Sequence, residues 1–224
     1  TNSKIIEIGS NDGTFLKNFN IKENKFIGFE PSKNVADIAL NNKIPTINKF
    51  FNKENLIDLK NFLGNTDLIC ASNVICHIPD LNNLIESIDL LLSKNGTFVF
   101  EEPYLGSMFE KVSYDQIYDE HIYIFSASAI SKIFVKYGFQ LTDVLPQITH
   151  GGSMRYVINR KNTTDVSNNV KNIINYELKN NLDTLQACLN FKKNCELSKK
   201  NIVNKINELK NSNKSICGYA ATSK

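Results

Sequence analysis

Long hydrophobic runs are absent from this 224-residue sequence. A membrane-spanning helix needs about 20 consecutive, mostly apolar residues, and no stretch of the chain approaches that length. The first residues also lack the basic segment followed by an apolar one that marks a secretory signal. We therefore expect a cytoplasmic protein that does not bind membranes.

Arginine is scarce as well, because Arg155 and Arg160 are its only occurrences. The formal net charge of +3 is too mild to indicate nucleic-acid binding. None of the five cysteines forms a Cys-x-x-Cys pair, so we expect no zinc knuckle, redox pair or other metal site. Thiols of this kind are typical of a reducing compartment.

A strong local pattern is present at Lys4-Ile-Ile-Glu-Ile-Gly-Ser-Asn-Asp-Gly13. The β-branched run over 5–8 predicts a buried parallel strand. Gly9 and Gly13 then permit a tight turn, and a helical pattern follows over 14–19. Such a turn presents backbone N–H groups that can hold a carboxylate or a phosphate.

The glycine spacing of this turn favours one class of ligand. It is Gly-x-x-x-Gly, whereas dinucleotide-binding folds use Gly-x-Gly-x-x-Gly, and Asp12 places a negative charge where a pyrophosphate would lie. A ligand that carries both an ammonium and a carboxylate, such as the methionine end of S-adenosylmethionine, fits better. The residues of the turn that we expect to bind this cofactor are Glu7, Gly9, Ser10, Asn11, Asp12 and Gly13.

A second apolar strand, Phe26-Ile-Gly-Phe-Glu30, also ends in an acid. An acid about 20 residues beyond the first turn commonly accepts hydrogen bonds from ribose hydroxyls, and Glu30 is placed for that role. The plainer interpretation is that Glu7 and Glu30 are only solvated acids at strand ends. The turn and both strands together favour nucleoside binding.

Strands and helices alternate over residues 4–100, which predicts an α/β fold with a mostly parallel sheet and helices on both faces. The expected strands cover residues 4–8, 26–30, 44–47, 67–71 and 96–102, and the expected helices cover 14–19, 33–41, 53–62 and 81–93. A helix at 128–137 precedes strands at 139–145 and 154–159, which we expect to finish the sheet in antiparallel fashion. Ligands bind such sheets at the carboxyl ends of the strands.

Histidine occurs in three segments that we consider for the chemistry. His77 follows the strand at 67–71, and Tyr118-Asp-Glu-His121 is the densest titratable cluster of the chain. A histidine near an acid and a tyrosine can act as a general base. His150-Gly-Gly-Ser153 suits a phosphate or a sugar hydroxyl. Each segment also has a plainer interpretation, either a helix cap or loop packing or a simple hairpin bend.

Composition changes late in the chain. Residues 161–169 are polar and predict a linker, while 170–209 carry a sparse helical pattern that predicts a helix or helix pair, either a bridge to another domain or a dimer arm. Residues from 215 onward begin like a new strand. We therefore divide the chain into a cofactor-binding domain (1–160), a linker with a helical segment (161–212) and the start of a truncated Rossmann-like domain (213–224). We expect it to be a piece of a longer protein.

Taken together, these motifs resemble those of the sugar C-methyltransferases, which use S-adenosylmethionine to methylate nucleotide-linked 4-keto-6-deoxy sugars. The matching stretches, in family order, are Glu7-Ile-Gly-Ser-Asn-Asp-Gly13, Gly28-Phe-Glu-Pro-Ser32, Ser72-Asn-Val-Ile-Cys-His-Ile-Pro-Asp80, Glu102-Pro-Tyr104, Tyr118-Asp-Glu-His121, His150-Gly-Gly-Ser-Met-Arg155 and Gly218-Tyr-Ala-Ala-Thr-Ser-Lys224. The resemblance implies a Rossmann-like class I methyltransferase domain and a sugar nucleotide substrate, dTDP-linked. We expect the family's amino-terminal zinc module and most of its carboxyl-terminal domain to lie outside this chain.

The resemblance also implies roles for individual residues. The reactive cluster would be Tyr118, Glu120 and His121, with His77 nearby. His121 would remove the C3 proton of the sugar beside its C4 ketone, and Glu120 would orient the imidazole or hold a sugar hydroxyl. Tyr118 or His77 would donate to the enolate oxygen. The further cofactor contacts would be Pro31 and Asn73, and the substrate contacts Tyr104, His150, Gly151 and Arg155.

Two other functions are compatible with the same residues. One is an O- or N-methyltransferase that acts on a sugar or another small molecule, which needs a base but no ketone. The other is a non-catalytic module that binds a nucleoside or holds partner subunits through residues 170–209. A nicotinamide-dependent reductase fits poorly because the glycine spacing is wrong. The chain is expected to be a monomer or a homodimer.

Overall fold

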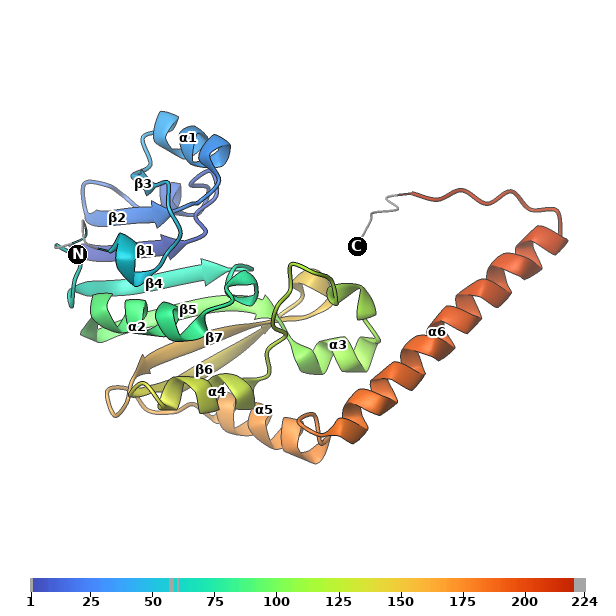
Figure 1. The fold of residues 1–224 in the computed structure, drawn as a ribbon. Coiled ribbons are helices and arrows are strands. Elements are labelled where there is room, and N and C mark those ends of the chain that lie inside the picture. The colour runs from blue at the N-terminus through green and yellow to red at the C-terminus, as the bar shows by residue number, and fades with distance from the viewer. Residues whose placement is uncertain (1, 57–58, 60, 220–224) are drawn as a thin grey trace.

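The computed structural model describes residues 2–56, 59 and 61–219 (Figure 1). The strands are β1 (Ser3–Ile8), β2 (Asn24–Phe29), β3 (Thr46–Ile47), β4 (Thr66–Ser72), β5 (Leu92–Pro103), β6 (Phe139–Gln147) and β7 (Ser153–Arg160). The helices are α1 (Lys33–Asn41), α2 (Leu81–Leu91), α3 (Leu105–Lys111), α4 (Ala127–Val135), α5 (Asn168–Lys179) and α6 (Leu185–Asn211). Within these ranges no helix combines the length and the apolar composition that a membrane crossing requires.

One sheet contains all seven strands, in the order β3-β2-β1-β4-β5-β7-β6. β1 to β5 pair in parallel, and β7 runs antiparallel between β5 and β6. The predicted parallel sheet with an antiparallel finish is thus confirmed. Strand order reverses between β1 and β4, and ligands bind open α/β sheets in the crevice at the carboxyl side of such a reversal.

The main core lies on the face of the sheet that α2 and α4 cover (Figure 1). Successive residues of a strand point to opposite faces, so Ile6 and Ile8 of β1 share this face with Phe98 and Phe100 of β5. The Phe98 and Phe100 rings stack with centroids 5.1 Å apart, and Tyr156 of β7 stacks on Phe100 at 4.9 Å. This apolar layer makes the sheet a firm support for the loops at its carboxyl edge.

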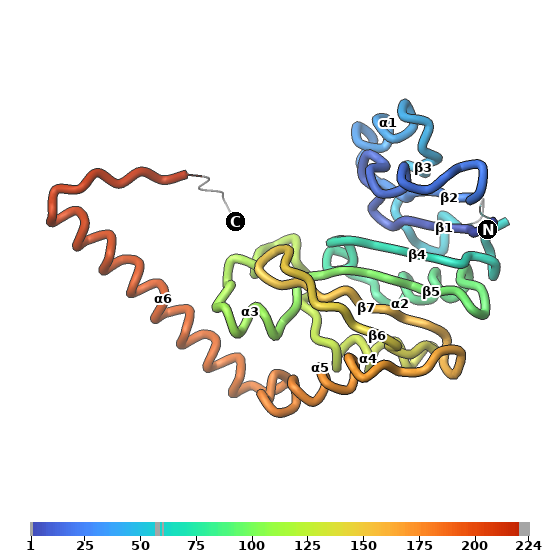
Figure 2. Tube along the Cα trace, turned by 180° about the vertical axis from the view of Figure 1, so that it is seen from behind, coloured from blue at the N-terminus to red at the C-terminus, as the bar shows by residue number. Residues whose placement is uncertain are grey.

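A smaller core on the opposite face joins β1 and β2 to α1. Ile5 and Phe26 point to this face, where they meet Leu16, Ala39 and Ile44. Figure 2 shows the molecule from this side, with β4, β5 and β7 toward the viewer and α1 at the top. Helices on both faces were predicted, and the structure confirms them, with α1 on the second face beside β2.

The helix expected at 14–19 is wrong in extent. The structure contains only a short 3₁₀ helix at Leu16–Asn18. The Asn18 side-chain amide donates to the carbonyls of Thr14 and Phe15 at 3.0 and 2.9 Å. Asparagine side chains that bond to nearby backbone groups compete with a helix, which explains why the pattern does not become an α-helix here.

The helix expected at 53–62 is also wrong in its described part, where a 3₁₀ helix at Lys53–Asn55 is followed by turns; residues 57, 58 and 60 lie outside the described residues. The Asn52 side chain caps this 3₁₀ helix by accepting from the Asn55 amide. The Asn55 side chain turns back and donates to the Phe50 carbonyl at 2.9 Å.

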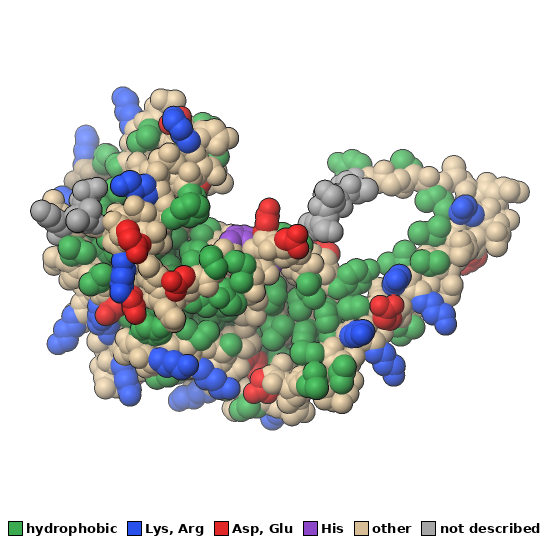
Figure 3. Space-filling model, viewed as in Figure 1, with side chains coloured by type: hydrophobic (Ala, Val, Ile, Leu, Met, Phe, Trp, Pro, Cys, Tyr) green, Lys and Arg blue, Asp and Glu red, His purple; other side chains and the backbone are tan. Residues whose placement is uncertain are grey.

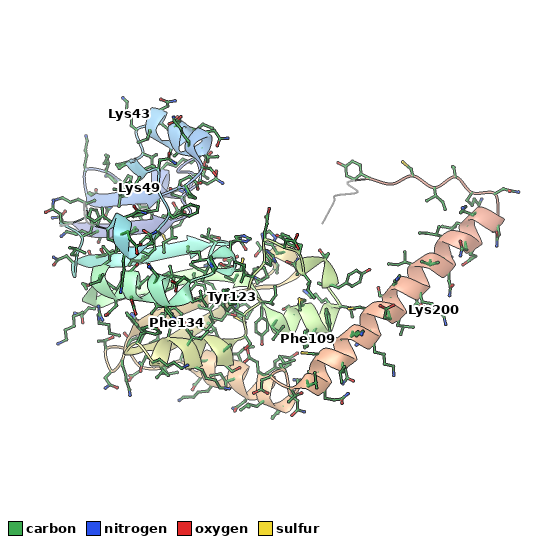
Figure 4. The ribbon with its side chains drawn as sticks, in the orientation of Figure 1. Lys43, Lys49, Phe109, Tyr123, Phe134 and Lys200 are labelled. Atoms are coloured by element: carbon green, nitrogen blue, oxygen red, sulfur yellow. The ribbon has the colours of Figure 1, made fainter. Side chains whose placement is uncertain are left out.

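The predicted helix pair after the sheet is confirmed. α5 packs against β6 and α4, whereas α6 extends away from the sheet (Figure 1). Phe109 of α3 anchors the start of α6 by stacking on Phe191 at 4.7 Å, and Figure 4 shows Phe109 between the two helices. The strand expected from Ser215 does not form over 215–219, which has no neighbouring strand to pair with, and 220–224 lie outside the described residues. The proposed domain boundaries remain a prediction.

Candidate active site

A cavity of about 800 Å³ opens at the carboxyl ends of β1, β2 and β4. Gly9, Glu30, Val74 and His77 are among its lining residues. The rings of Phe29 and Phe51 and the side chain of Leu84 add an apolar wall. A volume of this size with few polar groups is typical of sites for small ligands and cofactors.

The turn after β1 needs glycine at its first position. Gly9 has a φ of +68°, and a Cβ there would lie 2.3 Å from a methyl carbon of Val74. The amides of Gly9 and Ser10 both donate to the Phe29 carbonyl, at 2.8 and 3.0 Å. The turn is therefore tied to β2 and packs closely against the residues that follow β4.

Glu30 connects the turn after β1 to the end of β2. Its buried carboxylate accepts from the Asn11 amide at 3.1 Å and from the Ser32 amide at 2.8 Å. A carboxylate can accept about four hydrogen bonds, so Glu30 retains acceptor capacity at the cavity wall. Pro31 lines the same wall. This is the location that the prediction for ribose hydroxyls requires.

Glu7 lies on the face of β1 opposite to Ile8, which lines the cavity. Burial, and then the nearby charge of Asp12, raises the pKa of Glu7 to about 8. Its Oε2 atom is buried, and no hydrogen-bond partner for it occurs in the described part of the chain. The structure thus places Glu7 beneath the turn and outside the cavity wall, and a contact with the cofactor remains a prediction.

Asp12 and Gly13 border a different hollow, together with Thr14 and Lys17. The exposed Asp12 carboxylate accepts from the Thr14 amide at 3.0 Å, and hydrogen bonds to Thr14 lower the pKa of Asp12. The predicted contribution of these two residues to cofactor binding would therefore come from beside the main cavity.

Asn73 follows β4 in a left-handed conformation, with a φ of 54°. Its amide donates to the Glu101 carbonyl at 2.9 Å. Its side-chain Oδ1 is buried and has no partner among residues 2–56, 59 and 61–219. An unpaired buried acceptor is costly, and a donor such as an ammonium group would satisfy it.

His77 and His121 are brought together from two separate segments. The His77 ring lies 5.2 Å from the His121 ring, centroid to centroid, and Nδ1 of His77 is 2.6 Å from the Glu120 carbonyl oxygen. Nδ1 of His121 is 2.8 Å from the Gln116 carbonyl, and its Nε2 is 2.8 Å from the Tyr118 hydroxyl. Histidine surface, purple in Figure 3, is visible at this edge of the sheet.

These contacts assign the tautomers. A carbonyl oxygen only accepts, so Nδ1 carries the proton in both His77 and His121, and in the neutral ring Nε2 then holds the lone pair. Glu120 contributes its backbone carbonyl to His77, while its side chain is exposed. Orientation of His121 by the Gln116 carbonyl was missed by sequence reasoning, because a backbone contact leaves no signature in residue type.

Among the described residues, one group of three could hold a metal ion: the potential ligand atoms of Cys76, His77 and His121 all lie within 4.8 Å of one another. The Cys76 thiol is buried, and burial followed by the charge of Glu102 raises its pKa. Without a metal, that favours the neutral thiol over the thiolate. The expectation of no metal site stays a prediction.

The four expected substrate contacts do not share one location. Tyr104 is buried and donates to Glu177 Oε1 at 3.0 Å, so its hydroxyl is engaged in the core. The turn at His150 and Gly151 is exposed, and Gln116 donates to the His150 carbonyl at 3.3 Å. This contact brings the turn beside the segment that carries Tyr118. Arg155 donates to Glu101 Oε2 at 2.9 Å.

A family model described as a methyltransferase domain matches residues 1–144, more than half of the chain. The chain belongs to the methyltransferases. A second model, described as a C-methyltransferase C-terminal domain, matches residues 148–224. Together the two matches support an S-adenosylmethionine-dependent C-methyltransferase, as the motifs indicated, and the sugar substrate stays a prediction.

Among curated proteins, this methyltransferase is similar to the C-methyltransferase NovU of Streptomyces niveus, with 29% identity over 150 residues. The match covers 67% of this chain and 36% of the relative. The chain thus spans about a third of the length of that protein.

Solved structures show the same fold. An S-adenosylmethionine-dependent methyltransferase from Clostridium acetobutylicum is 13% identical with a TM-score of 0.56, covering 71% of this chain and 85% of that one. A possible histamine N-methyltransferase from Thermotoga maritima is 19% identical with a TM-score of 0.53, covering 70% and 82%. The predicted Rossmann-like class I fold is confirmed.

S-adenosylmethionine is the cofactor of this methyltransferase, and the residues present fit it. The cavity joins an acceptor-rich carboxylate at Glu30 to the glycine turn at Gly9. The unpaired Oδ1 of Asn73 offers an acceptor after the neighbouring strand, although Asn73 is not among the residues that line the cavity. That these groups hold the two ends of the cofactor stays a prediction.

Proposed function

We propose that this chain is the cofactor-binding and catalytic part of an enzyme that methylates C3 of a nucleotide-linked 4-keto-6-deoxy sugar, with dTDP as the expected nucleotide. The main support is that Tyr118 and His121 meet His77, a cavity-lining residue whose ring centroid lies 5.2 Å from that of His121. The substrate class comes from the motifs.

A carbon that bears hydrogen becomes a nucleophile only after a base removes the proton. The C4 ketone acidifies the C3 proton, and Nε2 of His121 holds the lone pair that accepts it. The breaking C–H bond leaves its electron pair on the enolate, largely on the ketone oxygen. General base catalysis of this kind contributes about 100-fold to 10,000-fold in rate.

The enolate oxygen needs a hydrogen-bond donor. The Tyr118 hydroxyl, 2.8 Å from Nε2 of His121, can transfer its hydrogen bond from the imidazole to that oxygen as the substrate enters. Donors aimed at a developing oxyanion often lower such barriers more than any other single effect. His77, the other donor that the motifs imply, can fill this role only when both of its ring nitrogens are protonated, because its Nδ1–H is already bonded to the Glu120 carbonyl.

S-adenosylmethionine supplies a methyl group on a positively charged sulfur: the carbon–carbon bond forms as the carbon–sulfur bond breaks, and that electron pair stays on sulfur. Glu30 and the turn at Gly9 would hold it in the cavity. His77, which lines the same cavity, would keep the base close to the acceptor carbon. Such positioning can account for a large part of the rate.

The test is proton NMR of a dTDP-4-keto-6-deoxyhexose in D₂O with this chain and S-adenosylhomocysteine. We expect the C3 proton signal to disappear faster than in an enzyme-free sample, because the base exchanges it for deuterium. The same measurement with a longer polypeptide that contains this chain shows whether further residues complete the site. Exchange with neither polypeptide would overturn C-methylation and favour the O- or N-methyltransferase alternative.

A further inference from the structure

Glu102 is fully buried at the carboxyl end of β5, on the same strand as Phe98 and Phe100. One of its oxygens, Oε1, accepts hydrogen bonds from three consecutive amides, those of Val74 at 2.9 Å, Ile75 at 2.6 Å and Cys76 at 3.4 Å. These amides begin the 3₁₀ helix Ile75–His77. A single carboxylate oxygen therefore holds the turn formed by residues 74–77.

The 74–77 turn begins in contact with the glycine turn that follows β1. Val74 packs so closely on Gly9 that a Cβ on the glycine would lie 2.3 Å from a Val74 methyl carbon. Val74 also lines the cavity itself. Any movement of the turn at Val74 would consequently change the shape of the cofactor site.

The same turn touches the 118–123 segment at its end. The Cys76 carbonyl accepts from the amides of Ile122 at 3.0 Å and Tyr123 at 3.3 Å. Nδ1 of His77 meets the Glu120 carbonyl at 2.6 Å. Figure 4 shows Tyr123 near the centre of the molecule, and its hydroxyl donates to the Pro79 carbonyl at 2.8 Å.

We propose that Glu102 is the positioning residue that sets the 74–77 turn, and with it His77 and the 118–123 segment, relative to the cofactor cavity. The proposal rests on the proposed function, because it assigns to Glu102 the spacing between the base and the cofactor. Misplacement of reacting groups by about 1 Å can cost about 100-fold in rate. Glu102 itself touches neither substrate nor cofactor in this scheme.

The contacts of Glu102 are concentrated on the 74–77 turn. Besides the three amides on Oε1, the Cys76 thiol lies against this carboxylate. The three amides on Oε1 require a strong acceptor at one point, and a carboxylate or an amide oxygen supplies it.

Glu177 of α5 offers a matched control. It is also buried, and its carboxylate accepts from the amides of Ala127 at 2.7 Å and Ser128 at 2.8 Å, and from the Tyr104 hydroxyl. It is therefore a buried acid that holds the start of a helix, but it does not border the cavity. Replacing it removes the same kind of interaction elsewhere.

The experiment compares Glu102→Ala, Glu102→Gln and Glu177→Ala in the full chain, with C3 exchange measured at saturating S-adenosylhomocysteine on samples of equal folded fraction. We expect Glu102→Ala to lose at least about 100-fold in exchange. Glu102→Gln keeps an acceptor oxygen and should stay within about 10-fold, while Glu177→Ala should stay near the parent. Equal losses in both alanine variants, or near-normal exchange in Glu102→Ala, would overturn the proposal.

A second measurement separates this proposal from the proposed function. In ¹H–¹⁵N NMR spectra of the folded protein, Glu102→Ala should move the amide signals of Val74, Ile75 and Cys76 and the ring signals of His77 and His121, and Glu102→Gln should largely restore them. If the parent chain shows no C3 exchange, the proposed function fails, and these shifts alone decide the positioning claim. Unmoved histidine signals in Glu102→Ala would refute it.

Discussion

The rings of His77 and His121 lie 5.2 Å apart, although one follows β4 and the other precedes α4. Backbone contacts produce this proximity, since His77 meets the Glu120 carbonyl and the Cys76 carbonyl accepts from the Ile122 amide. Two imidazole rings are therefore close enough to act on the same proposed substrate. Their separate roles can be tested by replacing them one at a time.

His121→Ala should lower turnover by at least about 100-fold, the low end for loss of a general base. Binding of S-adenosylmethionine should persist, because Glu30 and Gly9 line the cavity whereas His121 is not among its lining residues. Steady-state methyl transfer and calorimetric titration with the cofactor measure the two effects. Asp119→Ala, an exposed change in the same loop, is the control, and near-normal turnover in His121→Ala would contradict the base assignment.

Glu30→Ala should weaken binding of S-adenosylhomocysteine by roughly 10-fold or more, the scale of hydrogen bonds to a charged group. The side chain lines the cavity and also holds the amides of Asn11 and Ser32. Isothermal titration calorimetry gives the dissociation constant. The exposed variant Glu23→Ala should bind normally, and an unchanged affinity in Glu30→Ala would exclude the ribose role.

Because the pKa of Glu7 is raised in the folded protein, the free energy of unfolding should fall as pH rises. Burial, with the charge of Asp12, raises its folded-state pKa from 4.5 to about 8, so the folded chain binds more protons than the unfolded chain between these values. The contribution of Glu7 to the free energy of unfolding is fully present below its pKa in the unfolded chain, and it is lost as pH rises through its folded-state pKa of about 8. Relative to Glu7→Gln, the parent should lose on the order of 3 kcal/mol of unfolding free energy between pH 5 and 8.

Urea denaturation of the parent and of Glu7→Gln at several pH values measures this loss. The two proteins should differ progressively more at high pH, because glutamine cannot ionise. Parallel stability curves across the whole range would show that Glu7 does not titrate between pH 5 and 8.

Tyr104→Phe should destabilise the fold by about 1–3 kcal/mol, because it leaves the buried Glu177 carboxylate without one of its donors. We expect KM for the sugar nucleotide to change little, since the hydroxyl is already engaged in the core. Thermal unfolding and initial-rate kinetics check the two expectations. A large rise in KM with normal stability would instead support the substrate contact implied by the motif.

Local sequence determined the order and type of most elements. The β-branched run over 5–8 became β1, the pattern over 33–41 became α1 at Lys33–Asn41, and the acid after Phe29 lies at the cavity wall. Strands and helices of this kind depend mainly on residues close together in the chain, and the hydrophobic periodicity of the sequence reflects them. The helix expected at 14–19 failed where the Asn18 side chain bonds to the backbone, a competition that hydrophobic periodicity does not register.

The sequence by itself therefore determined the family and the residue types of the site, because motifs and strand patterns are local. Only the tertiary structure decided which groups meet. The pairing of β5 with β4 brings Glu102 beneath the 74–77 turn, and backbone carbonyls of Gln116 and Glu120 orient the two histidines. Such contacts join segments far apart in the chain through groups that every residue carries, so no pattern of side chains could announce them.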